Sequence, residues 1–100
     1  MAINDVIKFM KKKGFLDTFT VLTQFKDYKT DKHTFYNELN KFSYYNSYFR
    51  VKSDLIKKGI IKEEKNSKIK QIKLTEKGLE IYNKLNEINE LINNGKSTKN

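Results

Sequence analysis

One stretch, residues 43–74, constrains the fold of this chain most strongly, because its apolar pattern changes at a glycine. Before Gly59 the apolar residues recur at intervals of four, three and four, which places them on one side of a helix: Tyr44, Tyr48, Val51 and Leu55. Gly59 tolerates the positive φ that commonly ends a helix. After it, apolar residues of two strand-like segments flank a polar run at 65–68. The stretch therefore predicts a helix over 43–58 and a hairpin over 60–74.

The opposite side of the predicted helix is rich in hydrogen-bond donors and poor in carboxylates: Asn46, Ser47, Phe49, Arg50, Ser53 and Lys57. Residues 43–73 hold nine Lys or Arg against three Asp or Glu, a net charge of +6. Residues 76–93 hold two Lys against four Glu, a net charge of −2. This separation indicates two faces with different partners. A general abundance of lysine is the alternative interpretation, but it does not explain the change of sign.

Composition bounds the class of protein. A chain of 100 residues with a net charge of +9 is one domain at most. It has no cysteine, which excludes disulfides, cysteine nucleophiles and thiolate metal sites. No apolar run approaches the ~20 residues that a membrane span needs. At the N-terminus the charges follow the apolar part, the reverse of a secretory signal, so we expect a cytoplasmic protein with no membrane partner.

Three further helices are predicted before the central stretch, over 3–13, 15–26 and 31–41. The first has one apolar side and three terminal lysines, and we expect Gly14 to end it. The second is also compatible with a strand, but its apolar residues lack the alternation that a strand needs. Residues 27–30 are predicted to connect it to the third helix, which has Asp31 as its N-cap and Phe35 and Leu39 pointing inward.

The last helix is predicted over 76–93, with Thr75 as its N-cap, and residues 94–100 are expected to be a disordered tail. Its apolar residues form two neighbouring sides. We expect Leu79 and Tyr82 to pack on the same chain, while a seam pairs with a second copy: Ile81, Leu85, Ile88 and Ile92. The first helix, over 3–13, is a candidate for the same dimer interface. The alternative is that the whole stripe belongs to an ordinary core.

Residues for catalysis are not evident. His33 is the only histidine, and without cysteines it does not define a metal site, so an exposed helix residue is the simpler interpretation. No Gly-rich phosphate loop, nucleophile motif or paired acid and base stands out. We therefore expect no enzyme activity, no catalytic residues, no metal and no cofactor.

Two segments carry a resemblance to a known family. They are VKSDLIKKGIIKEE, residues 51–64, and IKLTEKGLEIYNKL, residues 72–85. With the helices predicted before them, they resemble the winged helix-turn-helix transcription regulators. The chain is similar to MarR-like and PadR-like proteins, and most of all to small archaeal and archaeal-virus regulators of that fold. The resemblance implies a mostly α protein with a small β-hairpin (α+β), forming a single winged-helix domain over 1–93 with an N-terminal helix and a long C-terminal helix.

The resemblance also implies which residues touch DNA. Helix 43–58 would be the recognition helix in the major groove, with base contacts from Asn46, Ser47, Phe49 and Arg50. Hairpin residues 62–73 would be the wing, on the backbone or in the minor groove, through Lys65, Asn66, Ser67, Lys68 and Lys70. Further backbone contacts would come from Lys32, Thr34, Tyr44, Tyr45, Ser53 and Lys57. The pair Tyr44-Tyr45 stands where the family more commonly has small polar residues.

The expected function is therefore sequence-specific binding of double-stranded DNA by a homodimeric transcriptional regulator. Two recognition helices would enter successive major grooves, ~34 Å apart. Two alternatives remain open. One is a nonspecific DNA-coating, chromatin-type protein of the same fold, and the other is a winged-helix protein–protein interaction module.

Overall fold

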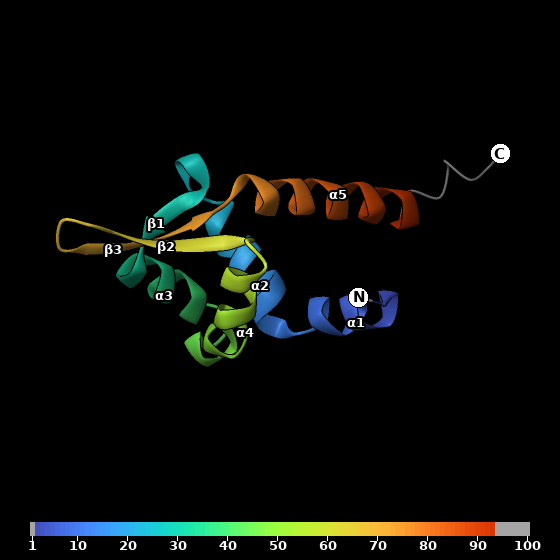
Figure 1. The fold of residues 1–100 in the computed structure, drawn as a ribbon, viewed down its shortest axis with the longest axis horizontal. Helices are drawn as coiled ribbons and strands as arrows, with labels where there is room; N and C mark the ends of the chain where they lie inside the picture. The colour runs from blue at the N-terminus through green and yellow to red at the C-terminus, as the bar shows by residue number, and fades with distance from the viewer. Residues whose placement is uncertain (1, 94–100) are drawn as a thin grey trace.

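A computed structural model describes residues 2–93, apart from the side chains of Tyr45 and Asn66. Within this range the chain is mostly helical, with a small three-stranded antiparallel sheet, and so has an α+β fold (Figure 1). The elements are, in order, α1 (Ile3–Met10), α2 (Lys13–Leu22), the short 3-10 helix η1 (Lys26–Tyr28), β1 (Lys29–Asp31), α3 (Lys32–Asn40), α4 (Tyr45–Lys57), β2 (Ile61–Asn66), β3 (Ile69–Leu74) and α5 (Glu76–Asn93).

Helices α2, α3 and α4 pack together with one face of the sheet around a single apolar core. The core residues are Phe15, Phe19, Val21, Leu22, Phe35, Leu39, Tyr48, Val51, Leu55, Ile60, Ile61, Ile72 and Leu74. The β2–β3 hairpin extends beyond the helices at one end of the molecule, and α1 and α5 project at the other end (Figure 1). The predicted inward face of α4 is confirmed except at Tyr44, which is 75% exposed because it precedes the first turn of the helix.

The central strand of the sheet is β3, which pairs with β2 on one side and with β1 on the other. Strand β1 lies partly in the segment 27–30 that was expected to be only a connection, so that expectation is wrong. Its Thr30 pairs with Ile72, more than forty residues later in the sequence. Three residues are too few for a period-2 pattern, so only the distant partner strand makes this segment a strand.

The α1–α2 boundary differs from the prediction. Helix α1 ends at Met10 rather than at residue 13, and Gly14 does not end it but is the second residue of α2. Gly14 is buried, and a Cβ atom built on it would overlap the carbonyl oxygen of Ser47 in α4. The glycine therefore permits two helices to approach closely, a role different from the predicted helix stop. The predicted helix 15–26 is also displaced, since α2 begins at Lys13 and stops at Leu22.

Other local predictions are confirmed. Gly59 has φ +73° at the end of α4. The Asp31 carboxylate accepts a 2.9 Å hydrogen bond from the Thr34 amide, which makes it the N-cap of α3. Thr75 Oγ1 accepts a 2.9 Å bond from the Gly78 amide, so it caps α5, whose bounds are those predicted.

Two smaller differences concern α3 and α4, which are one to two residues shorter at each end than predicted, as helix ends commonly are. Among residues 2–93, no helix has the length and apolar character required to cross a membrane. The predicted disordered tail, 94–100, lies outside the described residues.

Candidate nucleic-acid interface

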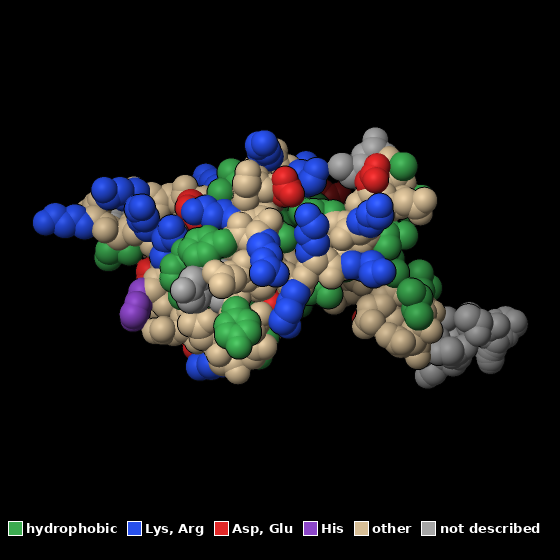
Figure 2. Space-filling view, turned by 90° about the horizontal axis from the view of Figure 1, so that it is seen from below, with side chains coloured by type: hydrophobic (Ala, Val, Ile, Leu, Met, Phe, Trp, Pro, Cys, Tyr) green, Lys and Arg blue, Asp and Glu red, His purple; other side chains and the backbone are tan. Residues whose placement is uncertain are grey.

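One face of the molecule is strongly basic. Figure 2 shows Lys and Arg side chains spread from the β2–β3 hairpin, across the surface around α4, toward the end where α1 lies. Cations line two surface hollows beside α4. One is lined in part by Lys52 and Lys57, and the other in part by Lys12, Lys13 and Arg50. The carboxylates seen on this face are few. Many of the cations in the chain therefore share one face of the molecule.

The outer face of α4 presents most of the predicted base-contacting residues to solvent. Asn46 and Arg50 are exposed, and Phe49 is 45% exposed. Ser47 differs from them, because it is half-buried and turned toward α2. Its hydroxyl lies 2.7 Å from the Tyr44 carbonyl oxygen, to which it donates a hydrogen bond. Three of the four predicted positions therefore share an accessible face.

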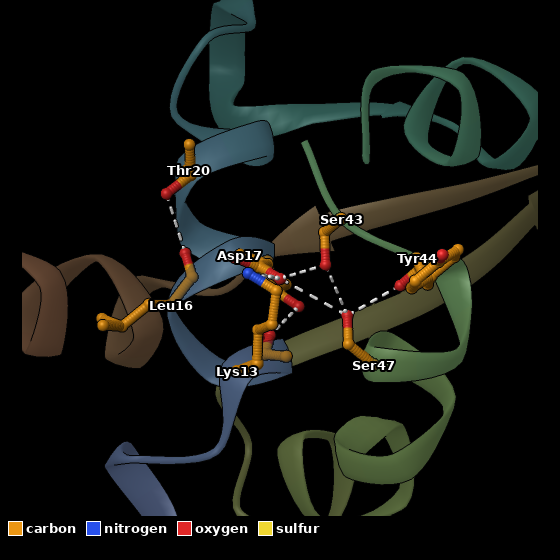
Figure 3. Close-up of polar contacts among 9 residues, drawn as sticks. Lys13, Leu16, Asp17, Thr20, Ser43, Tyr44 and Ser47 are labelled. Carbon is orange, nitrogen blue, oxygen red and sulfur yellow. Dashed lines mark hydrogen bonds and ion pairs between the residues drawn. The ribbon is translucent and has the colours of Figure 1, made fainter. Parts of the chain in front are cut away.

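A buried carboxylate on α2 holds the start of α4 in place (Figure 3). Asp17 Oδ2 accepts a 2.6 Å hydrogen bond from the Ser43 hydroxyl and lies 3.4 Å from the Ser47 hydroxyl. Lys13, one turn earlier in α2, places its ammonium 3.6 Å from the same oxygen. Ser43 therefore ties the α3–α4 turn to α2, and the N-cap of α4 is Tyr44. The sequence signal for this arrangement was the single acid in α2.

A partly buried cluster joins α3, α4 and β2 through Glu63. The hydroxyl of Tyr48, in the core, donates a 2.8 Å hydrogen bond to Glu63 Oε2. The ammonium groups of Lys52 and Lys32 lie 3.3 and 3.7 Å from Glu63 Oε1. Sequence reasoning missed Glu63, because its three partners come from two other elements.

The electrostatics of this cluster keep Glu63 ionised and Tyr48 protonated. Burial acts to raise the pKa of Glu63, but the hydrogen bond from Tyr48 and the two nearby lysines outweigh it, so the pKa is lowered. Burial raises the pKa of the Tyr48 phenol well above its ordinary value, and the Glu63 carboxylate adds to the effect. The charge of Lys32, a predicted DNA-backbone residue, is thereby partly compensated within the fold.

An aromatic group lies at the centre of the outer face of α4. The Phe49 ring centroid lies 5.7 Å from that of Tyr36 and 5.9 Å from that of Tyr48. The Lys52 ammonium stands 5.9 Å from the Phe49 centroid. The ring is therefore supported from behind by the core while part of its surface faces solvent. It offers an apolar contact surrounded by cations.

The predicted backbone-contacting residues have different surroundings. Ser53 and Lys57 are exposed and line a hollow of about 360 Å³ with Phe49. The Thr34 hydroxyl donates a 2.7 Å hydrogen bond to Asp31 Oδ1, so its side chain already serves the start of α3. Tyr44 is exposed, and the side chain of Tyr45 lies outside the description.

The strands of the β2–β3 hairpin extend further toward its tip than predicted, so the turn between them is shorter. Lys65 and Asn66 belong to β2, where they pair with Lys70 and Ile69. The turn consists of Ser67, which has φ +61°, and Lys68. The lysines at and near the tip are exposed: Lys65, Lys68 and Lys70.

The predicted dimer seam on α5 is divided. Ile81 and Leu85 are half-buried and pack against the core of the same chain, as Leu79 and Tyr82 do. The core of the same chain thus covers part of Ile81 and Leu85, the two residues of the seam that were expected to pair with a second copy. The outer half is open to solvent, with exposed fractions of 50, 65 and 73% for Ile88, Leu91 and Ile92.

Within residues 2–93, no three His, Cys, Asp or Glu side chains gather in a group that could hold a metal ion. His33 is exposed, with its Nε2 3.2 Å from the Asn37 amide nitrogen. Comparisons of the chain with models of protein families, with curated proteins and with solved structures gave no match.

Proposed function

We propose that this chain is a winged helix-turn-helix protein that binds double-stranded DNA sequence-specifically, as a homodimeric transcriptional regulator. One observation carries the proposal. The exposed, donor-rich face of α4 lies on the same basic side of the molecule as the lysine-rich β2–β3 hairpin (Figure 2). In this assignment α4 is the recognition helix, α3 is the helix before it, and the hairpin is the wing.

The dimensions of α4 suit a major groove. Its thirteen residues span about 20 Å at ~1.5 Å per residue, and a helix fits the groove's width of about 12 Å. Arg50 can donate two hydrogen bonds to guanine, and Asn46 can pair in the same way with adenine. The half-exposed ring of Phe49 can lie against a thymine methyl group. These three side chains are the proposed source of sequence discrimination.

The hairpin supplies affinity rather than discrimination. Lys65, Lys68 and Lys70 are exposed along a two-stranded arm that extends past the helices. Lysines placed against phosphates release counterions and stabilise a complex with any sequence. We assign these three residues to the DNA backbone or the minor groove.

The homodimer assignment depends on uncovered apolar residues at the opposite end of the molecule. The outer half of α5 exposes Ile88, Leu91 and Ile92, and α1 exposes Ile3 and Ile7. No residue of α1 is fully buried. Phe9 and Met10, at its C-terminal end, pack on the core, but an eight-residue helix is marginal in water without further packing. Both helices project away from the hairpin, so a second copy joined there leaves both basic faces accessible (Figure 1).

The test is fluorescence anisotropy of a labelled duplex from the DNA directly upstream of the chain's own gene, titrated at several salt concentrations. An unrelated duplex serves as competitor. We expect the unrelated duplex to compete at least ~10³-fold less well. Arg50→Ala should reduce this ratio by about 5- to 150-fold, corresponding to ~1–3 kcal/mol. Lys68→Ala should weaken both duplexes equally.

Two results would replace the proposal. Equal competition by both duplexes indicates a nonspecific DNA-coating protein, which the abundance of exposed lysine also fits. Absence of binding at low salt excludes a DNA function. The exposed aromatic residues Tyr44 and Phe49 would then favour a protein-docking surface.

A further inference from the structure

A second basic site lies on the side of α4 that faces α2. It is a hollow of about 270 Å³, lined by Lys12, Lys13, Gly14, Ser47, Arg50 and Val51. Its cations come from two elements far apart in the sequence, the α1–α2 junction and α4. Within residues 2–93, neither Lys12 nor Arg50 forms a salt bridge to a carboxylate, and no carboxylate lines the hollow.

The position of these cations is fixed by the packing of α2 on α4. Gly14 lies directly against the carbonyl oxygen of Ser47, so the residues before it are held next to α4. Asp17 reinforces the contact through its hydrogen bond from Ser43. Lys13 places its ammonium 3.6 Å from Asp17, so its charge is partly compensated. Lys12 is the N-cap of α2 and is exposed.

The chemistry of the hollow favours an anion. Lys12 and Arg50 supply two charges, and no side chain caps the start of α2 by hydrogen bonding. The first amides of a helix point toward an anion placed there, and the helix dipole adds to the attraction. These amide donors supplement the two cations, and the convergence of the cations on the hollow is the main evidence for an anion site.

We propose that this hollow binds a phosphate of the DNA backbone, with Lys12 as its principal cation. The proposal rests on the DNA-binding function proposed above and adds a second backbone contact to it. The β2 strand that begins the hairpin packs on the Lys52 side of α4 through Glu63, whereas the hollow lies on the Ser47 side. Backbone contacts would therefore bracket the recognition helix, and Arg50, which belongs to the base-reading face, also lines the hollow.

The experiment compares Lys12→Gln with two matched charge controls. Lys11→Gln removes an exposed neighbouring lysine that does not line the hollow, and Lys84→Gln removes an exposed lysine from α5. Affinity for the upstream and the unrelated duplex is measured as a function of salt, after circular dichroism shows unchanged folding. We expect Lys12→Gln to lower the salt slope by about 0.9, the value for one phosphate contact, and to weaken both duplexes alike.

Phosphate-ethylation interference gives a second readout on the upstream duplex. Lys12→Gln should abolish the interference at one group of phosphates. The phosphates whose interference is abolished by the hairpin variant Lys68→Gln should be unaffected by Lys12→Gln. If wild-type protein binds no duplex, the proposed function fails. If wild-type protein binds but Lys12→Gln matches the two controls in slope and interference pattern, only the phosphate site is overturned. A loss confined to the upstream duplex would also overturn it, because it would indicate base reading.

Discussion

The hydrogen bond between Tyr48 and Glu63 offers the sharpest test of how the core supports the basic face. Tyr48→Phe removes a hydroxyl that donates at 2.8 Å to a carboxylate. Hydrogen bonds to charged groups contribute ~1.5–3 kcal/mol. Glu63 keeps its two lysines, and its side chain is 20% exposed, so we expect the low end, about 1.5 kcal/mol.

Glu63→Gln retains an acceptor for Tyr48 but loses the charge. Partly exposed ion pairs contribute ~0–1 kcal/mol each, so the loss of both lysine contacts and of the charged acceptor should cost ~1–2 kcal/mol. Because the two side chains share one hydrogen bond, the double variant should cost less than the sum of the single variants. We expect a coupling free energy of about 1 kcal/mol.

The assay is urea unfolding followed by circular dichroism for the wild type, both single variants and the double variant. Glu87→Gln, an exposed charge change on α5, is the control and should change stability by less than ~0.5 kcal/mol. A coupling below ~0.3 kcal/mol, the usual error of additivity, would refute the contribution that the Glu63 charge makes to this hydrogen bond. The Glu63 pKa lies below its ordinary value of 4.5, so its stabilisation is present above that pH and is lost as the pH falls through the folded-state pKa.

Three further predictions concern packing, capping and assembly. Gly14→Ala should destabilise by ~1–3 kcal/mol through overlap with α4, whereas Gly59→Ala should cost ~1–2 kcal/mol through its positive φ. In urea titrations Gly59→Asn should be more stable than Gly59→Ala. Alanine variants as stable as the wild type at both positions would contradict the close helix approach at Gly14 and the positive φ at Gly59. Asp31→Ala should cost about 1 kcal/mol at neutral pH. Because the Thr34 amide lowers the pKa of Asp31, this difference should shrink as pH falls through the folded-state value, as unfolding at a series of pH values would reveal. Ile92→Asp should halve the mass measured by sedimentation. At concentrations low enough for the wild type to be monomeric, the variant should unfold at the same urea midpoint as the wild type. An unchanged mass would exclude this part of α5 from a dimer contact.

Several elements were predictable because their signals are local. Asp31 caps α3 and Thr75 caps α5 with bonds that reach only three residues along the chain. Gly59 occupies a positive φ at a helix end, and α5 has the predicted bounds. Each depends on neighbouring residues and on the helical period, which are directly readable in the order of amino acids.

The exposed face of α4 was predictable for a similar reason. When Val51 and Leu55 are placed inward, the helical period leaves Asn46, Phe49 and Arg50 outward. Ser47 was the exception, because its surroundings depend on how closely α2 approaches, and no pattern within α4 contains that information.

The remaining features were decided by tertiary structure. Strand β1 exists because β3 pairs with it, Gly14 lets α4 pass directly over α2, and Glu63 contacts residues of two other elements. These contacts connect residues 11 to more than 40 positions apart. The order of amino acids determined the period, caps and turns of each segment, because those depend on backbone geometry within a few residues. Which segments approach, and which polar groups they bury together, depended on packing all of the apolar faces into one core at once.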